Sequence, residues 1–312
     1  MKIGDDKMRT KKKKISLLTA FLIIAFSGIF YFINPTLANP NQTDQDTNII
    51  QANQEISGDE TLQIQFLDVG QADSILIQDG DEFMLIDAGN NADGTKLVSY
   101  FQSLGIKSFQ YVVGTHAHED HIGGMDDIID NFDIDTFYMP DVITTTATFE
   151  SVLDSLDKKN IPFQIPTIDS SFMLGNATIT VLYVGTDESN LNNTSIVLKL
   201  TYGNTSILFM GDAEAEVEKA IENKDIHADV LKIGHHGSDT SSSTSFLEKV
   251  NPNYAVISVG SGNSYGHPNN TTINNLINRN IKIYRTDENN TIVMTTDGKN
   301  ITFQSIQTDT NG

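Results

Sequence analysis

Three of the chain's seven histidines lie within the segment THAHEDH at residues 115–121. The apolar run just before this segment predicts a buried strand, so the histidines follow directly on a strand end. Neutral imidazoles and a carboxylate together are a ligand set for zinc, manganese or iron. Alternation lets His116 and His118 face one ion while Asp120 and His121 face another, although a solvated polar loop is the alternative interpretation. Four potential ligands therefore converge at the end of one strand, and this constrains the fold more than any other feature.

The absence of cysteine narrows what can hold a metal. It excludes disulfide scaffolds, cysteine zinc sites and thiol nucleophiles, so any metal must be held by His, Asp or Glu. Charge is unevenly distributed, because residues 1–38 hold seven Lys or Arg against two Asp. The remainder contains 13 basic and 39 acidic residues, a net charge of −26. A body this acidic disfavours binding to a long phosphate backbone through its overall field.

The first 38 residues have the pattern of an export signal or a membrane anchor. Four lysines, at positions 11–14, precede the uncharged apolar run 15–33, which is about as long as a bilayer core requires. Small residues at 36–38 also fit a cleavage site, so a cleaved signal peptide and a retained anchor both stay open. In either case the basic flank predicts that the chain beyond it is extracytoplasmic.

A flexible polar linker is predicted at 39–60, a folded domain at 61–306 and a tail at 307–312. Within the domain, apolar runs predict strands at 61–68, 74–78, 83–87, 109–114, 135–139, 178–184, 194–201, 205–210, 228–233, 254–259, 281–284, 291–296 and 300–305. Amphipathic segments predict helices at 95–104, 122–131, 147–159, 213–223, 244–250 and 271–279. Two sheets layered with helices outside are the expected α/β arrangement, and a doubly wound α/β fold is the alternative.

Two further strands end in potential ligands. The strand at 206–210 leads to Asp212, whose carboxylate could bridge two ions; capping of a helix from residue 213 is the competing explanation. The strand at 228–233 leads to His235 and His236. One of this pair is expected to bind metal, and the other to hydrogen-bond substrate or orient its neighbour.

These segments and four others, FLDVGQADS at 66–74, LIDAG at 85–89, LKIGHHGS at 231–238 and YGHP at 265–268, resemble the metallo-β-lactamase fold superfamily. The resemblance is closer still to the hydrolase domain of ComEC-type competence proteins and their stand-alone relatives, and it runs from about residue 61 to 303. It implies an αββα sandwich with a dinuclear site along one sheet edge.

The resemblance also implies a role for each site residue. The first ion is expected at His116 and His118, and the second at Asp120, His121 and His235, with Asp212 shared and His236 as the substitute for His235. Asp87 is expected to brace the histidine loop by hydrogen bonds. No histidine occurs at 122–211, where many superfamily members supply another ligand, and the ComEC-like branch has Asn192 to Ser195 in that region instead.

The implied activity is that of an exported or membrane-anchored hydrolase with two divalent ions, Zn²⁺ or Mn²⁺, acting through a metal-bridging hydroxide. Asp120 would orient the hydroxide, and His267 would protonate or hydrogen-bond the leaving oxygen. His236 would hydrogen-bond the substrate where His235 is the ligand. A phosphodiesterase or nuclease acting on single-stranded DNA beside a separate channel protein is the first hypothesis. A hydrolase of a small ester, lactone or cell-wall phosphodiester is the second, and a non-catalytic, metal-stabilised binding module is the third.

Overall fold

The computed structural model describes residues 61–307. The predicted signal or anchor at 1–38 and the linker at 39–60 lie outside this range, as does the tail beyond residue 307. Within 61–307, no helix is both long and apolar enough to cross a membrane.

Two sheets form the centre of the described domain. The first contains, in spatial order, β15 (Ile301–Ile306), β14 (Thr291–Thr296), β1 (Leu62–Phe66), β2 (Ser74–Asp79), β3 (Glu82–Ala88), β4 (Ser108–Val113), β5 (Asp133–Tyr138) and β6 (Phe163–Gln164). The second contains β13 (Lys282–Arg285), β12 (Tyr254–Ile257), β11 (Val230–Lys232), β10 (Thr205–Phe209), β9 (Val197–Tyr202), β8 (Ala177–Tyr183) and β7 (Ser171–Leu174). Strands β3 to β6 run parallel to one another, as do β10 to β13.

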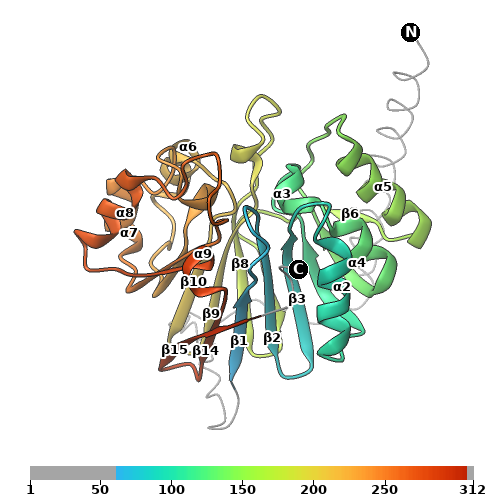
Figure 1. The fold of residues 1–312 in the computed structure, drawn as a ribbon, viewed down its shortest axis with the longest axis horizontal. Coiled ribbons are helices and arrows are strands. Elements are labelled where there is room, and N and C mark those ends of the chain that lie inside the picture. Colours follow the sequence, from blue (N-terminus) through green and yellow to red (C-terminus); the bar gives the residue numbers. More distant parts are fainter. Residues whose placement is uncertain (1–60, 308–312) are drawn as a thin grey trace, which may run out of the picture. The chain divides into compact units, whose positions relative to one another are not determined.

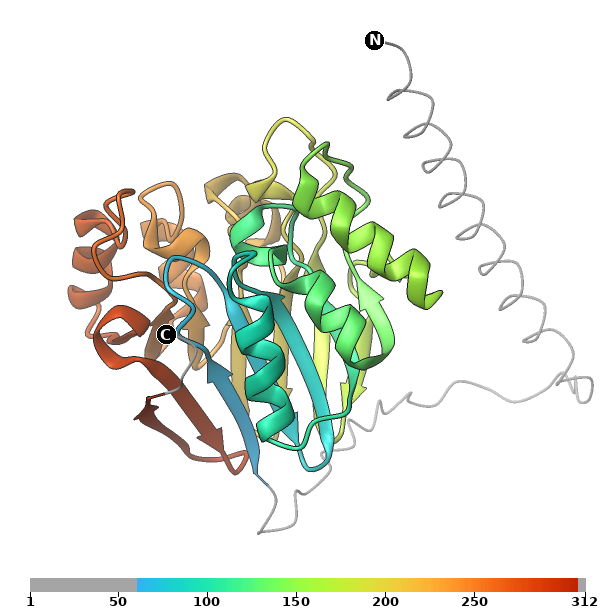
Figure 2. The ribbon, with the colours of Figure 1, turned by 45° about the vertical axis from the view of Figure 1, so that its right-hand side comes forward.

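Helices cover the outer face of each sheet (Figure 1, Figure 2). The first sheet carries α2 (Gly94–Ser103), α3 (Glu119–Ile122), α4 (Met125–Asn131) and α5 (Ala147–Lys159), and the second carries α6 (Ala215–Ile221), α7 (Thr244–Val250) and α8 (Asn270–Ile277). Three shorter elements complete the set: α9 (Thr286–Asn289) and the 3₁₀ turns η1 (Asn192–Thr194) and η2 (Gly234–Gly237).

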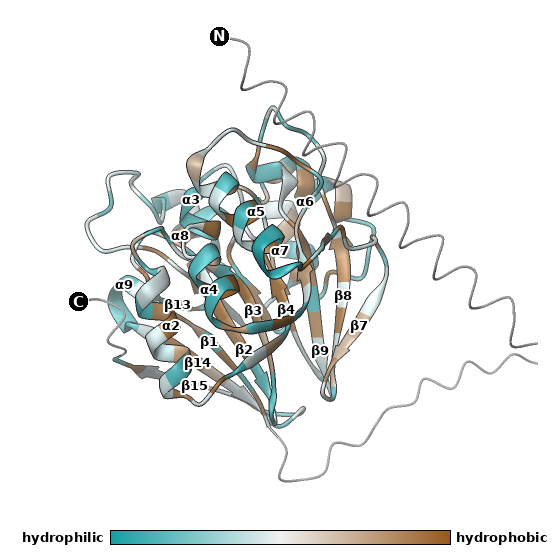
Figure 3. Ribbon diagram, turned by 90° about the vertical axis from the view of Figure 1, so that its right-hand side faces the viewer, coloured by the Kyte–Doolittle hydropathy of each residue, from teal (hydrophilic) through white to brown (hydrophobic). Residues whose placement is uncertain are grey.

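The hydrophobic core is divided among the three interfaces that this layering creates. One cluster packs the first sheet against α2, α4 and α5, a second fills the space between the sheets, and a third packs the other sheet against its helices. Between the sheets, the rings of Phe66 and Phe209 lie 6.4 Å apart. Figure 3 shows the hydrophobic strands between more hydrophilic helices. The αββα prediction is confirmed and the doubly wound alternative is wrong, because a doubly wound fold has a single sheet.

Local signals predicted many of the elements well. The helices α5 and α7 and the strand β14 have the predicted bounds. The side chain of Thr146 accepts a hydrogen bond from the backbone N–H of Phe149 at the start of α5, and that of Ser243 accepts one from Phe246 at the start of α7. Both are residue types that commonly cap helices. The short elements β6, β7 and α9 were not predicted, because so few residues show no periodicity.

The helix predicted at 122–131 is instead two helices, α3 and α4, separated by Gly123 and Gly124. The φ angles of these glycines, −59° and −86°, are ordinary, and the glycines are needed for close approach. A Cβ atom on Gly123 would lie 2.2 Å from the backbone of Asn90 and Asn91. The break therefore packs the histidine loop against the loop that follows β3.

Replacing Gly123 by alanine is expected to destabilise the fold by more than about 3 kcal/mol, because the obstructing atoms are backbone and cannot rotate away. Urea unfolding of the full chain measures the effect. Gly80→Ala is the matched control: its φ is +60° but nothing lies within 4 Å of the added Cβ, so only about 1–2 kcal/mol of backbone strain is expected. Equal losses in the two variants would contradict this account of Gly123.

Candidate metal centre

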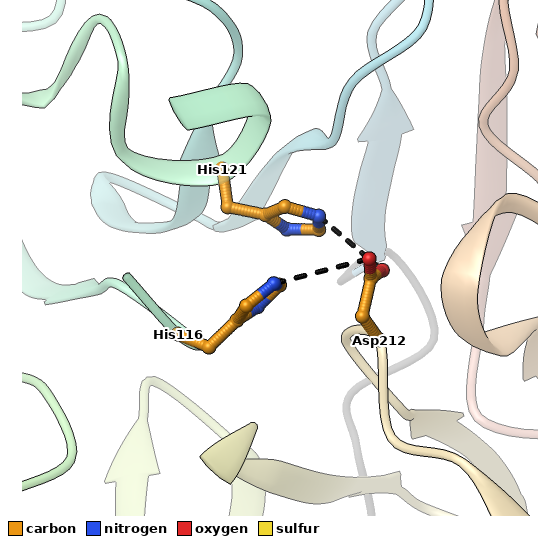
Figure 4. A group of neighbouring side chains, drawn as sticks. All are labelled: His116, His121 and Asp212. Carbon is orange, nitrogen blue, oxygen red and sulfur yellow. Dashed lines mark ion pairs between the residues drawn. The ribbon is translucent and has the colours of Figure 1, made fainter. Parts of the chain in front are cut away.

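Three buried side chains, two from the histidine loop and one from the segment after β10, lie close together (Figure 4). His116 follows β4, His121 lies on α3, and Asp212 follows β10. Nε2 of His121 is 3.2 Å from Oδ1 of Asp212, and Nε2 of His116 is 3.8 Å from Oδ2. The helix α6 begins only at Ala215 with Glu214 at its N-cap, so the interpretation of Asp212 as a helix cap is wrong.

His236 completes a second group with Asp120 and His121. Its Nε2 lies 3.3 Å from Oδ2 of Asp120 and 3.7 Å from Oδ2 of Asp212. Its Nδ1 lies 3.0 Å from the carbonyl oxygen of Ser258, which can only accept a hydrogen bond. Because Nδ1 must therefore carry hydrogen, Nε2 is the position open to a proton or a metal ion.

The backbone decides which histidine of the pair faces inward. His235 and His236 both have φ of 51°, in the left-handed region that few non-glycine residues adopt. This turn buries His236, whereas the side chain of His235 stays 23% exposed. Nε2 of His235 is 3.9 Å from Asp212, and its Nδ1 faces Glu214 at 3.4 Å. Within residues 61–307, the three-residue groups able to hold a metal include His236 but not His235.

Two other predicted site residues lie beside these groups. Nδ1 of His118 is 3.0 Å from Nε2 of His116, so the two imidazoles are neighbours, but His118 is absent from the three-residue groups among the described residues. His267 lies beside His235, with the ring centroids 5.4 Å apart. The structure thus groups His121 with His116 as well as with Asp120, whereas the predicted assignment separated them.

Asp87 lies behind the histidine loop and joins its two ends. It accepts hydrogen bonds from the backbone N–H and the hydroxyl of Thr115, both at 2.8 Å. Its Oδ2 is also 2.8 Å from Nδ1 of His121. Because the Thr115 hydroxyl donates to Asp87, its oxygen is free to accept from Nδ1 of His116 at 3.2 Å. These hydrogen bonds to Nδ1 fix the imidazoles of His116 and His121 with Nε2 toward the cluster.

Residues 192–195, which lie in the region where many superfamily members supply another histidine ligand, are close to the site. The Ser195 hydroxyl accepts a hydrogen bond from the backbone N–H of Asp212 at 3.0 Å and lies 3.4 Å from Nδ1 of His116. The side-chain nitrogen of Asn192 lies 3.4 Å from the ring nitrogens of His235. Ser195 therefore supports two residues of the cluster from behind, and Asn192 lies on its more exposed side.

The pKa shifts show that the cluster favours a positive charge at its centre. Burial alone would lower the pKa of His121, yet the carboxylates of Asp212 and Asp87 raise it well above its usual value. Burial would raise the pKa of Asp212, but His121 and His236 hold it well below its usual value. The pKa of His116 is lowered by burial and by its proximity to His121, so His116 is neutral. The charge at the centre can be supplied by a proton or by a metal ion.

Unpartnered atoms show that the side chains fit a metal better than they fit one another. Nε2 of His121, Oδ1 of Asp212 and Nε2 of His236 are buried without a well-aligned hydrogen bond among the described residues, although the first two face each other at 3.2 Å as an ion pair. A buried polar atom left in this state costs about 1–3 kcal/mol. Imidazole nitrogens and a carboxylate oxygen at such spacing are a suitable donor set for Zn²⁺ or Mn²⁺.

A buried ion pair beside the cluster was not anticipated from the sequence. Oδ2 of Asp73 is 2.7 Å from Nζ of Lys232, and both side chains are at most 2% exposed. Oδ1 of Asp73 lies 3.5 Å from Nδ1 of His236. The backbone N–H of Asp73 donates to the carbonyl oxygen of Asp120 at 3.1 Å. Asp73 thus connects β11 with both ligand-bearing loops. The only sequence signal was a lysine inside an otherwise apolar strand.

Comparison with known proteins identifies relatives of this domain. The model of the metallo-β-lactamase superfamily matches residues 67–261, more than half of the chain. ComE operon protein 3 of Bacillus subtilis (strain 168) is 29% identical over 253 residues, covering 74% of this chain and 32% of that protein. Competence protein ComA of Neisseria gonorrhoeae is 30% identical over 226 residues, covering 70% and 30%. The chain thus spans about a third of the length of these curated relatives.

Solved structures share the fold at low sequence identity. The metallo-β-lactamase fold protein YhfI from Bacillus subtilis aligns with a TM-score of 0.50 and 15% identity, covering 73% of this chain and 96% of that chain. CmlA, a diiron β-hydroxylase from Streptomyces venezuelae, aligns with a TM-score of 0.50 and 13% identity, covering 72% and 52%. These likenesses concern the fold alone.

Proposed function

The chain belongs to the metallo-β-lactamase superfamily, and on this premise we propose that it is a metal-dependent phosphodiesterase. The family resemblance inferred from the sequence motifs is confirmed, including the similarity to competence proteins. Superfamily members are generally metal-dependent hydrolases, and the His/Asp groups of this chain could hold metal. Nuclease activity and the use of two ions are the more specific parts of the proposal.

One observation carries the proposal: three buried donor atoms, each without a well-aligned hydrogen bond, come together from three separate loops. One ion would be held by His116, His121 and Asp212, with His118 adjacent. The other would be held by Asp120, His236 and the shared residues. Bound divalent ions would supply Lewis acidity that activates water and neutralises charge on a phosphoryl group.

The protein's own groups would orient the reactants. The side chain of Asp120 is 32% exposed, in contrast to 2% for Asp212, so it is the carboxylate that substrate and water can reach. Burial would raise its pKa, but the nearby imidazoles of His236 and His121 lower it, so Asp120 is ionised and can accept a hydrogen bond from the attacking water. Burial lowers the pKa of His267, so its imidazole is neutral and could donate a hydrogen bond to the leaving oxygen.

The substrate class rests on two opposing observations. Similarity to competence proteins favours single-stranded DNA, degraded outside the membrane beside a separate channel protein. The net charge of −26 beyond residue 38 favours a short diester, or a lactone or cell-wall phosphodiester, over a long polyanion. We propose a phosphodiester of modest length. The apolar run 15–33 supports placing the domain outside the membrane, anchored or secreted.

A substrate panel tests this function. The full chain, loaded with Mn²⁺ or Zn²⁺, is incubated with single-stranded DNA, bis-p-nitrophenyl phosphate, a lactone and a chromogenic cephalosporin. Both phosphodiesters are expected to be cleaved, and Asp212→Ala is expected to lower kcat/KM by about a thousandfold, because the shared carboxylate is lost.

Each other outcome selects a different function. Cleavage of the lactone or cephalosporin without either diester would replace the phosphodiesterase proposal by the small-ester hydrolase. Metal bound at full stoichiometry, without turnover of any substrate, would indicate the non-catalytic binding module. The surface variant Lys158→Met controls for nonspecific loss, since among residues 61–307 its ammonium pairs with Asp130 alone and its side chain is 68% exposed.

A further inference from the structure

Tyr265 is the most exposed large hydrophobic side chain among the described residues, at 72%. It lies in the loop between β12 and α8, which also carries His267. The rings of Tyr265 and His267 are stacked, with centroids 5.8 Å apart and planes inclined by 25°. An aromatic ring held in water beside a candidate active site presents a face on which a planar ligand could stack.

The loop that presents Tyr265 is held in place by Asn263. Its side-chain nitrogen donates to the carbonyl oxygens of Gly260 and His267 at 2.9 and 2.6 Å. Its oxygen accepts from the backbone N–H groups of Tyr265 and His267, both at 3.1 Å. Gly260 in turn donates to the side chain of Gln71 at 3.1 Å. Because these contacts fix the loop backbone, the stacked pair is already ordered before a ligand arrives.

A succession of rings leads from Tyr265 to the metal centre. The ring of His267 lies 5.8 Å from Tyr265 and 5.4 Å from His235. Nε2 of His235 is 3.9 Å from Oδ2 of Asp212. A phosphodiester at the metal centre would therefore have the substituent on its leaving side close to the stacked pair.

We propose that Tyr265, stacked on His267, is a platform for a nucleobase next to the scissile phosphodiester. The inference rests on the proposed function and specifies its substrate as a nucleotide or short oligonucleotide. Two nearly parallel rings present a flat π-surface, which suits a planar base better than a puckered sugar. Stacking does not depend on net charge, so it would supply affinity to a body whose acidity repels phosphates.

Binding of matched oligomers tests the platform. A fluorescently labelled short thymidine oligomer is compared by anisotropy with an abasic oligomer of equal length and phosphate number. The full-length protein carries Mn²⁺ and Asp120→Ala, which prevents cleavage during the measurement. Tyr265→Ala is expected to weaken binding of the thymidine oligomer by about tenfold and to leave binding of the abasic oligomer as it was. Tyr265→Phe keeps the ring and is expected to keep the affinity.

Controls separate failure of the inference from failure of the proposed function. Ile277→Ala removes another exposed apolar side chain, on α8, and is expected to change neither affinity. The platform would be overturned if Tyr265→Ala weakened binding of both oligomers equally or changed the binding of neither. It would also be overturned if the variant weakened binding of the abasic oligomer alone. If protein with Asp120 intact cleaves no diester while base-dependent binding persists, the platform stands and the phosphodiesterase proposal fails.

Discussion

Replacing His236 by alanine is expected to remove one metal ion per chain and to lower phosphodiester hydrolysis by about a thousandfold or more. Its Nε2 is buried without a hydrogen-bond partner, 3.3 Å from Asp120 and 3.7 Å from Asp212. Its other nitrogen is committed to the carbonyl oxygen of Ser258. Alanine would leave two acidic side chains facing each other without the imidazole between them. Metal content after dialysis, measured by mass spectrometry, gives a readout that does not depend on turnover.

His235→Ala is the matched comparison, because it alters the adjacent residue of the same turn. His235 is partly exposed and faces Glu214, so its loss is expected to preserve metal content and to affect turnover by about tenfold at most. The opposite result, metal lost with His235→Ala and kept with His236→Ala, would restore the assignment made from the sequence. Loss of metal in both variants would mean that the turn itself had collapsed, and circular dichroism would show this.

Replacing Lys232 by methionine is expected to destabilise the protein by about 3–5 kcal/mol. The substitution conserves much of the side-chain volume but leaves the Asp73 carboxylate buried without its ammonium partner. The experiment is urea unfolding of the full chain in EDTA, so that metal binding does not contribute to the free energy of unfolding. Metal affinity is expected to fall as well, because Asp73 also holds the backbone of Asp120 and faces His236.

Two variants make this prediction specific. Lys158→Met breaks an exposed ion pair with Asp130 of similar length, 2.6 Å, and is expected to cost less than about 1 kcal/mol. Adding Asp73→Asn to Lys232→Met removes the uncompensated charge and is expected to recover part of the lost stability. If Lys232→Met and Lys158→Met cost the same, the buried pair does not have the structural role assigned to it here.

The sequence predicted the features that depend on neighbouring residues. The bounds of α5 and α7 were predicted correctly, and the structure shows that their caps, Thr146 and Ser243, lie directly beside them. The apolar residues of each strand are likewise adjacent in the sequence. The histidine loop and Asp212 were likewise identified because each follows its own strand. The interruption at Gly123 was missed because its cause is the backbone of Asn90 and Asn91, more than a helical turn away in the sequence.

Sequence alone thus determined the mixed α/β composition and the residue types available to hold metal, since strand periodicity and strand-end ligands are local properties of the chain. The choice of two layered sheets rested on the motif resemblance. Tertiary structure alone decided that His236 rather than His235 turns inward. Both residues lie in a left-handed backbone turn, and the imidazole that is buried needs the Ser258 carbonyl oxygen as its hydrogen-bond acceptor. Tertiary structure also decided that Lys232 meets Asp73, 159 positions apart in the chain. Only packing of the two sheets brings such distant groups into a space from which water is excluded, where a buried charge must find its partner.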